Sequence, residues 1–246
     1  MNPQVGFLLN QSLGSLRNSN LDSAELYLKQ ALRIQSNNPH VLRLLGVVYA
    51  QRKKYSEALN YLNKALKHLP RDSLILSNLG NVFLELKKYN NALDAYDKSI
   101  KIDPTYAEAW SNKGNALHEL KRFDEAIAHH DKALSLNPYY AEAWSNKGNA
   151  LHQLKRYGEV ILHLDKALDL DPDMDWVPGN LLHAKMKMGS WACLNDSLSK
   201  VLAKIAETKK VANPFELLSV TDNALLLKKY SEVYAQEKYP ENSSLG

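Results

Sequence analysis

The sequence lacks several features that mark other classes of protein. Its 246 residues include a single cysteine, Cys193, which excludes an internal disulfide framework. No window approaches the roughly 18 continuous apolar residues of a membrane-spanning helix, so we expect no membrane span. Residues 1–11 lack the basic start and long apolar run of a secretory signal. These absences lead us to expect a cytoplasmic protein.

Motifs of catalysis and of cofactor binding are missing as well. The sequence contains no glycine-rich phosphate loop and no nucleophile elbow. Its histidines are not joined by the cysteines or paired carboxylates that complete a metal site at the usual spacing. We therefore expect neither an enzyme nor a cofactor or metal site in this chain.

Charge gives little reason to expect a nucleic-acid partner. The formal net charge is +4, which is small for this length, although a basic pair recurs at residues 53–54, 87–88, 121–122 and 155–156. Two interpretations stay open: a surface for an acidic partner or nucleic acid, or cations that complement helix dipoles. Acidic residues follow the pairs closely, at Glu57, Asp124 and Glu159, and they favour the second interpretation.

The dominant feature that the sequence does contain is an internal repeat. The segment AEAWSNKGNALH occurs at residues 107–118 and again at residues 141–152, 34 positions later. Glycines, prolines and alanines keep the same period, at Gly46, Gly80, Gly114, Gly148, Pro70, Pro104, Pro138, Pro172, Ala58, Ala92 and Ala126. A fixed period of this length indicates one supersecondary unit stacked in tandem.

The period defines five repeats, which are residues 5–38, 39–72, 73–106, 107–140 and 141–174. Within each repeat, apolar residues recur at helical spacing on both sides of a polar turn, which predicts a helix–turn–helix unit. The first repeat has Ser12 in place of the glycine, as a terminal repeat that packs on one side allows. After residue 174 the period fades, and we expect a C-terminal helical cap or linker at 175–238 and a polar tail at 239–246.

The repeat resembles the tetratricopeptide repeat (TPR) family. The resemblance rests on Trp110, Gly114, Leu117, Ala126, Ala133 and Pro138, with near matches in the repeats on either side. It departs from the family at Lys113 and Lys147, where leucine is usual, and at His130, where an aromatic residue is common. The resemblance implies an all-α, right-handed TPR superhelix of about five repeats with a C-terminal helical cap. It also implies a protein–protein interaction module whose first helices line a concave groove.

Asparagines recur on one face of the predicted first helices. The sixth and ninth positions of three repeats form an asparagine ladder, which comprises Asn78, Asn81, Asn112, Asn115, Asn146 and Asn149. Residues three apart share a helix face, and each amide offers both hydrogen-bond donors and an acceptor. We therefore predict that the ladder holds the backbone of an extended polypeptide in the groove. The alternative is that these asparagines only keep a polar face hydrated.

Serine and histidine accompany the ladder at neighbouring positions. Ser111, Ser145, His118 and His152 complete the predicted peptide-binding groove. The expected partner is thus a protein or peptide in an extended segment, with nucleic acid and membrane not expected and self-association left open.

A second resemblance lies in the C-terminal segment. The stretches at residues 179–191, 213–223 and 237–240 resemble the segment that joins the repeats to the catalytic half in bacterial relatives of O-linked N-acetylglucosaminyltransferases. It implies an alternative function, the substrate-recruiting part of such a glycosyltransferase. No strand-rich catalytic sequence occurs within the 246 residues, so the enzyme's chemistry is expected to be absent from this chain.

Overall fold

The computed structural model describes residues 2–189, 194–207, 210, 228, 231, 232, 234 and 235, and every regular element in these residues is helical. The predicted polar tail at 239–246 and most of the predicted linker beyond residue 210 lie outside this part. The helices are α1 (Pro3–Arg17), α2 (Leu21–Ile34), α3 (Pro39–Gln51), α4 (Tyr55–His68), α5 (Ser73–Glu85), α6 (Tyr89–Ile102), α7 (Ala107–Glu119), α8 (Phe123–Leu136), α9 (Ala141–Gln153), α10 (Tyr157–Leu170), α11 (Val177–Lys187) and α12 (Leu194–Ala206).

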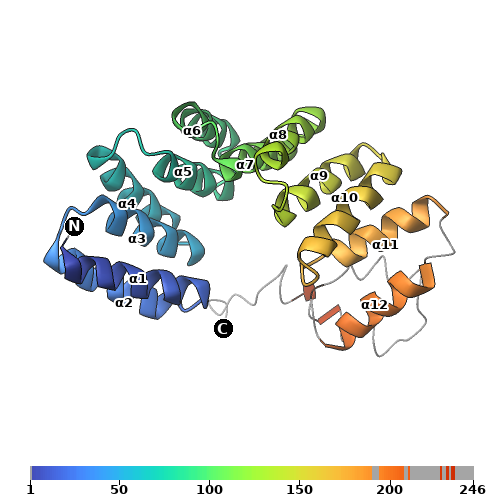
Figure 1. The fold of residues 1–246 in the computed structure, drawn as a ribbon, viewed down its shortest axis with the longest axis horizontal. Helices are drawn as coiled ribbons and strands as arrows, with labels where there is room; N and C mark the ends of the chain where they lie inside the picture. Colours follow the sequence, from blue (N-terminus) through green and yellow to red (C-terminus); the bar gives the residue numbers. More distant parts are fainter. Residues whose placement is uncertain are drawn as a thin grey trace, which may run out of the picture. The chain divides into compact units, whose positions relative to one another are not determined.

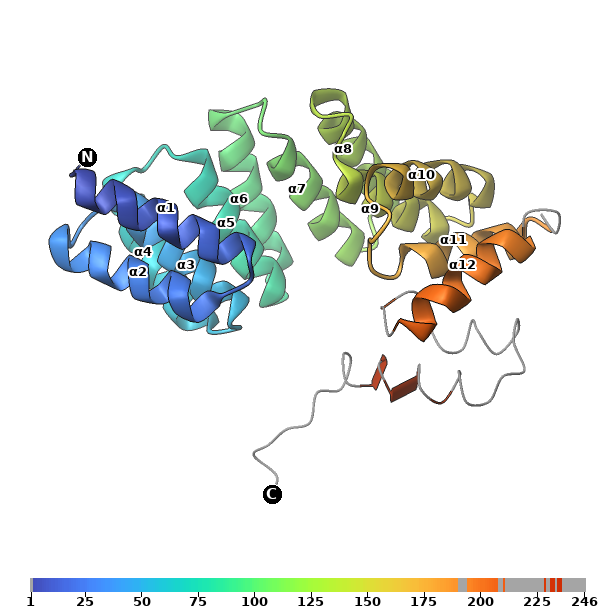
Figure 2. The ribbon, with the colours of Figure 1, turned by 60° about the horizontal axis from the view of Figure 1, so that its bottom comes forward.

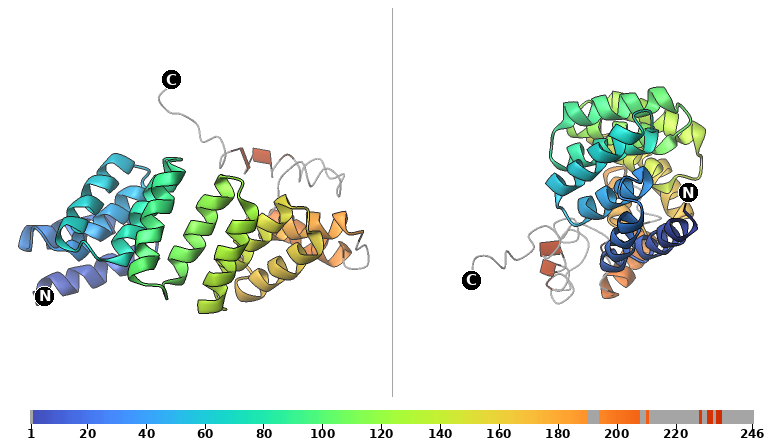
Figure 3. Two further views of the ribbon diagram at one scale, coloured as in Figure 1. Left: turned by 90° about the horizontal axis from the view of Figure 1, so that it is seen from above. Right: turned by 90° about the vertical axis from the view of Figure 1, so that its left-hand side faces the viewer.

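The chain divides into two units, Met1–Arg122 with α1–α7 and Phe123–Gly246 with α8–α12 (Figure 1). In the N-terminal unit α1 packs on α2, α3 on α4 and α5 on α6, and in the C-terminal unit α9 packs on α10. First helices of neighbouring repeats also touch, α3 with α5, α5 with α7, and α9 with α11. Figures 2 and 3 show these helix pairs following one another along the chain within each unit. The predicted all-α repeat fold is confirmed.

A left-handed residue ends the first helix of every repeat. The fifteenth position has a positive φ throughout, at Ser19, Lys53, Lys87, Lys121 and Lys155. In the second repeat, Lys54 N donates to the Tyr49 carbonyl and Lys53 N to the Ala50 carbonyl, both at 2.9 Å. This pair of bonds is a Schellman motif, which satisfies the last carbonyls of a helix and reverses the chain. The basic pairs noted in the sequence therefore include the residue that turns the first helix into the second.

The same turn reveals a sixth hairpin that the sequence did not predict in full. Gly189 lies 34 residues after Lys155 and has a φ of 65°. It follows α11, which packs against α10 and against α12. Val177, Leu181 and Ala184 of α11 share a buried core with Leu151 and Leu164. The repeat architecture thus continues past residue 174, although the glycine of the earlier repeats is replaced there by Leu182.

Close contact between the two helices of a repeat depends on the glycine that recurs at its eighth position. A Cβ on Gly46 would lie 2.5 Å from Leu62 Cγ, and a Cβ on Gly148 would lie 2.5 Å from Leu164 Cδ2. A Cβ on Gly80 would overlap the ring of Tyr96, which is fully buried. In these three repeats the contacts join the eighth and twenty-fourth positions, so glycine is required by space rather than by its backbone angles.

Two departures from the family pattern are explained by ion pairs between neighbouring repeats. Lys113 Nζ on α7 lies 2.6 Å from Asp97 Oδ1 on α6, and Lys147 Nζ on α9 lies 2.7 Å from Asp131 Oδ1 on α8. Both lysine side chains are largely buried, with 18% and 14% of their surface exposed. The lysine stems therefore pack where leucine is usual, while the ammonium groups reach a carboxylate of the preceding helix.

Within the part of the chain that the structure describes, no helix has both the length and the apolar character needed to cross a membrane.

We predict that Gly80→Ala destabilises the N-terminal unit by about 1–3 kcal/mol, because the added methyl group meets the rigid, buried ring of Tyr96. The matched control is Gly14→Ala in α1 of the same unit, where a Cβ would meet nothing within 4 Å. That change should stabilise the protein by about 0.5–1 kcal/mol through helix propensity alone. Urea unfolding followed by circular dichroism measures both. Equal stabilisation by the two alanines would contradict the packing argument.

Candidate binding groove

The asparagine ladder lies on the first helices, with Asn78 and Asn81 on α5, Asn112 and Asn115 on α7, and Asn146 and Asn149 on α9. Asn81 is exposed and the other five are partly buried. The first two pairs belong to the N-terminal unit and the third to the C-terminal unit. Each pair therefore offers polar side chains at the surface of its own unit.

Two of the three ninth-position asparagines, Asn81 and Asn149, already accept hydrogen bonds from their own chain. Tyr96 Oη donates to Asn81 Oδ1 at 2.7 Å, and burial raises the pKa of this phenol, which keeps it protonated. Asn180 Nδ2 on α11 donates to Asn149 Oδ1 at 3.0 Å. In both asparagines the oxygen is engaged, so what remains for a partner is the amide NH2 group, a donor.

The sixth-position asparagines behave differently. Asn78, Asn112 and Asn146 make no side-chain hydrogen bond within the described residues. The Asn78 Nδ2 atom is also buried from solvent. It therefore donates a hydrogen bond neither to another group of the described chain nor to bulk water. Unsatisfied buried donors are uncommon in folded proteins, because each costs about 1–3 kcal/mol of desolvation.

The serines and histidines predicted for the groove divide into two groups. Ser111 and Ser145 are buried, with 0% and 4% of their surface exposed, so their hydroxyl groups lie beneath the surface that a partner would meet. His118 and His152 are partly exposed. His118 Nδ1 lies 3.8 Å from Glu119 Oε1 of its own helix.

Two residues of α11, Asn180 and His183, contact residues of the predicted groove and were not predicted from the sequence. His152 Nε2 lies 2.9 Å from His183 Nδ1, and Tyr157 meets the His152 ring edge-on. Asn180 and His183 fall 34 residues after Asn146 and Asn149, so they continue the ladder into the sixth hairpin. Extending the period past residue 174 would have found them, but the change from asparagine to histidine obscured it.

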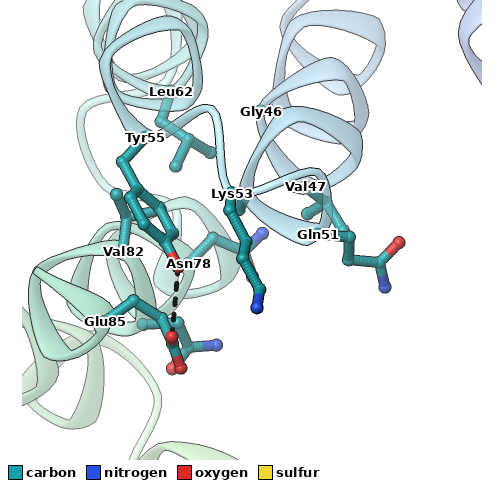
Figure 4. Close-up of a pocket in the computed structure, with 11 residues that line it drawn as sticks. Gly46, Val47, Gln51, Lys53, Tyr55, Leu62, Asn78, Val82 and Glu85 are labelled. Carbon is teal, nitrogen blue, oxygen red and sulfur yellow. Dashed lines mark hydrogen bonds between the residues drawn. The ribbon is translucent and has the colours of Figure 1, made fainter. Parts of the chain in front are cut away.

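A cavity of about 370 Å³ opens between α3 and α5 in the N-terminal unit (Figure 4). Its apolar wall includes Gly46, Val47 and Val82, and its polar wall includes Asn78 and Asn81 of the ladder. The sequence predicts no cavity at this end of the ladder. Its volume is at the lower end of the range for ligand sites, which suits one side chain of a bound segment.

Opposite charges flank this cavity. Lys53 from the turn and Glu85 from α5 both line it, and they are not within ion-pair distance of each other. Tyr55 Oη of α4 donates to Glu85 Oε2 at 3.2 Å, as the dashed line in Figure 4 marks, and Gln51 points away from this contact. Burial, together with the Glu85 carboxylate, raises the pKa of the Tyr55 phenol, so it stays a donor.

The tyrosine–glutamate contact recurs one repeat later, where Tyr89 Oη donates to Glu119 Oε2 at 3.4 Å. At the corresponding positions of the following repeat stand Phe123 and Gln153. The hydroxyl donor and the carboxylate acceptor are thus lost together. The thirteenth position of the repeat thus carries a hydrogen-bonded carboxylate in the N-terminal unit, at Glu85 and Glu119, and a neutral amide in the C-terminal unit, at Gln153.

No group of three or more histidine, cysteine, aspartate or glutamate side chains in the described residues is arranged to hold a metal ion.

Comparison with family models assigns the chain to a known family. Tetratricopeptide repeat models match residues 15–79, 107–140 and 141–174, and a TPR repeat model matches residues 80–121. Together these matches cover residues 15–174 without a gap. The chain belongs to the tetratricopeptide repeat proteins, whose repeats generally mediate protein–protein interaction.

Solved structures of several TPR proteins share this fold. PilF of Pseudomonas aeruginosa has a TM-score of 0.71 at 18% identity, over 96% of this chain and 98% of PilF. A thermophilic TPR protein of Thermus thermophilus scores 0.65 at 19% identity, over 76% of this chain and 97% of its own. A TPR protein of Parabacteroides merdae scores 0.65 at 20% identity, over 99% of this chain and 96% of its own.

No curated protein matches the sequence. The matching family models end at residue 174, and none of them is a glycosyltransferase model. The resemblance of the C-terminal segment to a glycosyltransferase linker therefore gains no support from these comparisons.

Two histidines of the C-terminal unit, His163 and His183, have pKa values below the ordinary histidine value. His163 is buried against the indole of Trp144, with ring centroids 5.3 Å apart. Burial lowers its pKa, the nearby Lys147 lowers it further, and Asp131 and Glu159 only partly oppose this. Burial, aided by Lys187, likewise lowers the pKa of His183.

We predict that this unit loses stability as the pH falls below about 6.5, the ordinary histidine pKa. Below that pH the unfolded chain binds protons that the folded state excludes, so acid favours unfolding. Amide hydrogen exchange of α9–α11, corrected for the intrinsic rate, should show more opening at pH 5.5 than at pH 7.5. The double variant His163→Phe and His183→Gln should flatten this pH dependence. The control is His40→Gln, at an exposed position of α3. An unchanged pH dependence in the double variant would refute the assignment.

Proposed function

We propose that this protein binds an extended polypeptide segment along the ladder of asparagines on its first helices. The observation that carries the proposal is the set of sixth-position amides, Asn78, Asn112 and Asn146, which have no hydrogen-bond partner in the described residues. Asparagine is a mediocre helix former, so its recurrence on one helix face is not explained by helix stability. A partner that supplies hydrogen bonds at this spacing accounts for it.

The hydrogen bonds inside the protein limit which chemical groups of a partner the ladder can bind. Asn81 and Asn149 present NH2 donors, because their oxygens accept from Tyr96 and Asn180. Donors of this kind recognise carbonyl oxygens, and an extended polypeptide presents backbone carbonyls at regular intervals whatever its side chains are. The ladder thus favours recognition of the main chain over recognition of a particular sequence.

Several amides are needed for useful affinity. A neutral hydrogen bond contributes a net of about 0.5–1.5 kcal/mol, so one or two asparagines would bind a peptide only weakly. Asn78 also lines the cavity of the N-terminal unit, so it lies where a side chain of the partner would enter. The cavity beside it adds apolar contact, with Val47 and Val82 available to one partner side chain.

The glycosyltransferase alternative has no observation of its own in the described residues. Its recruiting step would use the same groove, so the test below applies to it as well. Its further claim, a catalytic domain elsewhere, makes no prediction about the side chains described above.

We predict that the triple variant Asn78→Ala, Asn112→Ala and Asn146→Ala weakens binding of unstructured polypeptides by roughly tenfold or more, from the loss of several net hydrogen bonds. Stability should not fall, because these side chains bond nothing in the free protein. Binding is measured by fluorescence polarisation on a set of labelled, unstructured peptides of unrelated sequence.

The matched control is the triple variant Asn60→Ala, Asn63→Ala and Asn91→Ala, which makes the same change at three exposed positions of the second helices α4 and α6. It should bind as the unmodified protein does. If both variants keep full affinity, or if both lose affinity equally, the proposal is wrong and the ladder is only a hydrated polar face.

A further inference from the structure

A second cavity, of about 300 Å³, lies on the N-terminal unit away from the ladder. Its apolar floor is made by Leu32 of α2, Leu42 of α3 and Tyr61 of α4. None of its lining residues belongs to the asparagine ladder or to the cavity beside it. Any ligand of this site would therefore bind independently of the groove.

The cavity lies at a position where two later repeats carry tryptophan and this repeat, like the one after it, carries leucine. Leu42 is the fourth residue of its repeat, and the fourth residues of two later repeats are Trp110 and Trp144. Each of those indoles donates its Nε1 hydrogen to a proline carbonyl at 2.9 Å, Trp110 to Pro104 and Trp144 to Pro138. At Leu42 the repeat has no indole, and the space that an indole fills elsewhere is open.

The groups that hold the indole elsewhere have counterparts around this cavity. Trp144 stacks on His163, with ring centroids 5.3 Å apart, and the residue in register with His163 is Tyr61. The residue in register with Pro138 is Ser36, which also lines the cavity. Its carbonyl accepts no backbone hydrogen bond in the described residues. The site thus retains an aromatic ring to stack on and a carbonyl to accept an indole N–H.

The rim of this cavity is basic. Lys64, Lys67 and His68 of α4 line it, no carboxylate lines it, and none of the three forms an ion pair in the described residues. The next repeat differs, since Lys98, in register with Lys64, pairs with Asp94 on its own helix at 2.5 Å. The residue four before Lys64 is Asn60, which cannot neutralise it. The rim therefore carries positive charge that only an external anion can balance.

The basic rim and the aromatic floor meet at Tyr61. Lys64 Nζ lies 5.8 Å from the centroid of the Tyr61 ring, and Tyr49 stacks against the same ring with centroids 5.2 Å apart. Tyr49 and Lys64 thus fix the orientation of Tyr61 and bring a cation to the edge of the apolar space. A ligand would satisfy this arrangement by combining a flat aromatic ring with a nearby negative charge.

We propose that this cavity is a second binding site, which takes a tryptophan side chain flanked by acidic residues on a partner polypeptide. The indole would occupy the space left by Leu42, stack on Tyr61 and donate its N–H to the Ser36 carbonyl. The acidic neighbours would pair with Lys64, Lys67 and His68. The contact between the two molecules would then resemble the contact that Trp144 makes within this chain.

The test titrates the full chain with the blocked pentapeptide Ac-Glu-Glu-Trp-Glu-Glu-NH2 by isothermal calorimetry at low ionic strength. Leu42→Trp fills the cavity with the chain's own indole and should abolish binding. Lys64→Gln with Lys67→Gln should weaken it about tenfold, since two charge pairs near the surface are lost. The matched control, Lys98→Gln with Lys101→Gln in the next repeat, should leave it unchanged.

Peptide controls separate the possible sources of a signal. Replacing the tryptophan of the peptide by alanine, or its glutamates by lysines, should remove binding, and free N-acetyltryptophan should bind far more weakly than the pentapeptide. Equal binding of the alanine peptide would show charge attraction without a ring site and would overturn the proposal. Unchanged affinity of the Lys64 and Lys67 variant would overturn it too, even if Leu42→Trp failed to fold. The triple asparagine variant of the groove should bind the pentapeptide normally, which keeps the two sites distinguishable.

Discussion

The contact on which the rest of this structure depends is the close crossing of two helices at a glycine. The eighth position of a repeat meets the twenty-fourth, as Gly46 meets Leu62 and Gly148 meets Leu164, with no room for a Cβ between them. Because the two helices pack this closely, each repeat is a thin, rigid hairpin that can stack on the next. The first helices then come into contact with one another, α5 with α7 in the N-terminal unit and α9 with α11 in the C-terminal unit, and these helices carry the ladder and its continuation.

Local chemistry supports this crossing at both ends of the hairpin. The left-handed residue at the fifteenth position, such as Lys53, reverses the chain over a few residues, and lysine tolerates the conformation at a cost of about 1–2 kcal/mol. At the other end, the residue before proline leaves the helical region, as Asp103 does after α6. Between these ends, Lys113 and Lys147 reach carboxylates of the preceding helix, so neighbouring repeats are linked by charge as well as by apolar contact.

The two cavities lie at different places in the same repeated plan. The cavity beside Asn78 is lined by Gly46 and Val47 of α3 and by Asn78 and Asn81 of α5, which belong to the ladder. The cavity above Tyr61 forms where Leu42 replaces the tryptophan of later repeats. A repeat protein can thus acquire a cavity where one large side chain of its packing pattern is replaced by a smaller one.

The sequence by itself determined the repeat length, the helical pairs and the face on which the asparagines lie, because a period of 34 residues and helical spacing are properties of the chain alone. Only the tertiary structure decided which of those side chains are available. Ser111 shares the predicted face yet is buried, and Asn149 has its oxygen engaged by Asn180 on a helix that the fading period concealed. The physical reason is that burial and hydrogen bonding depend on neighbours about 30 residues away. A side chain's position in its own helix says which way it points, whereas the next helix decides what it meets.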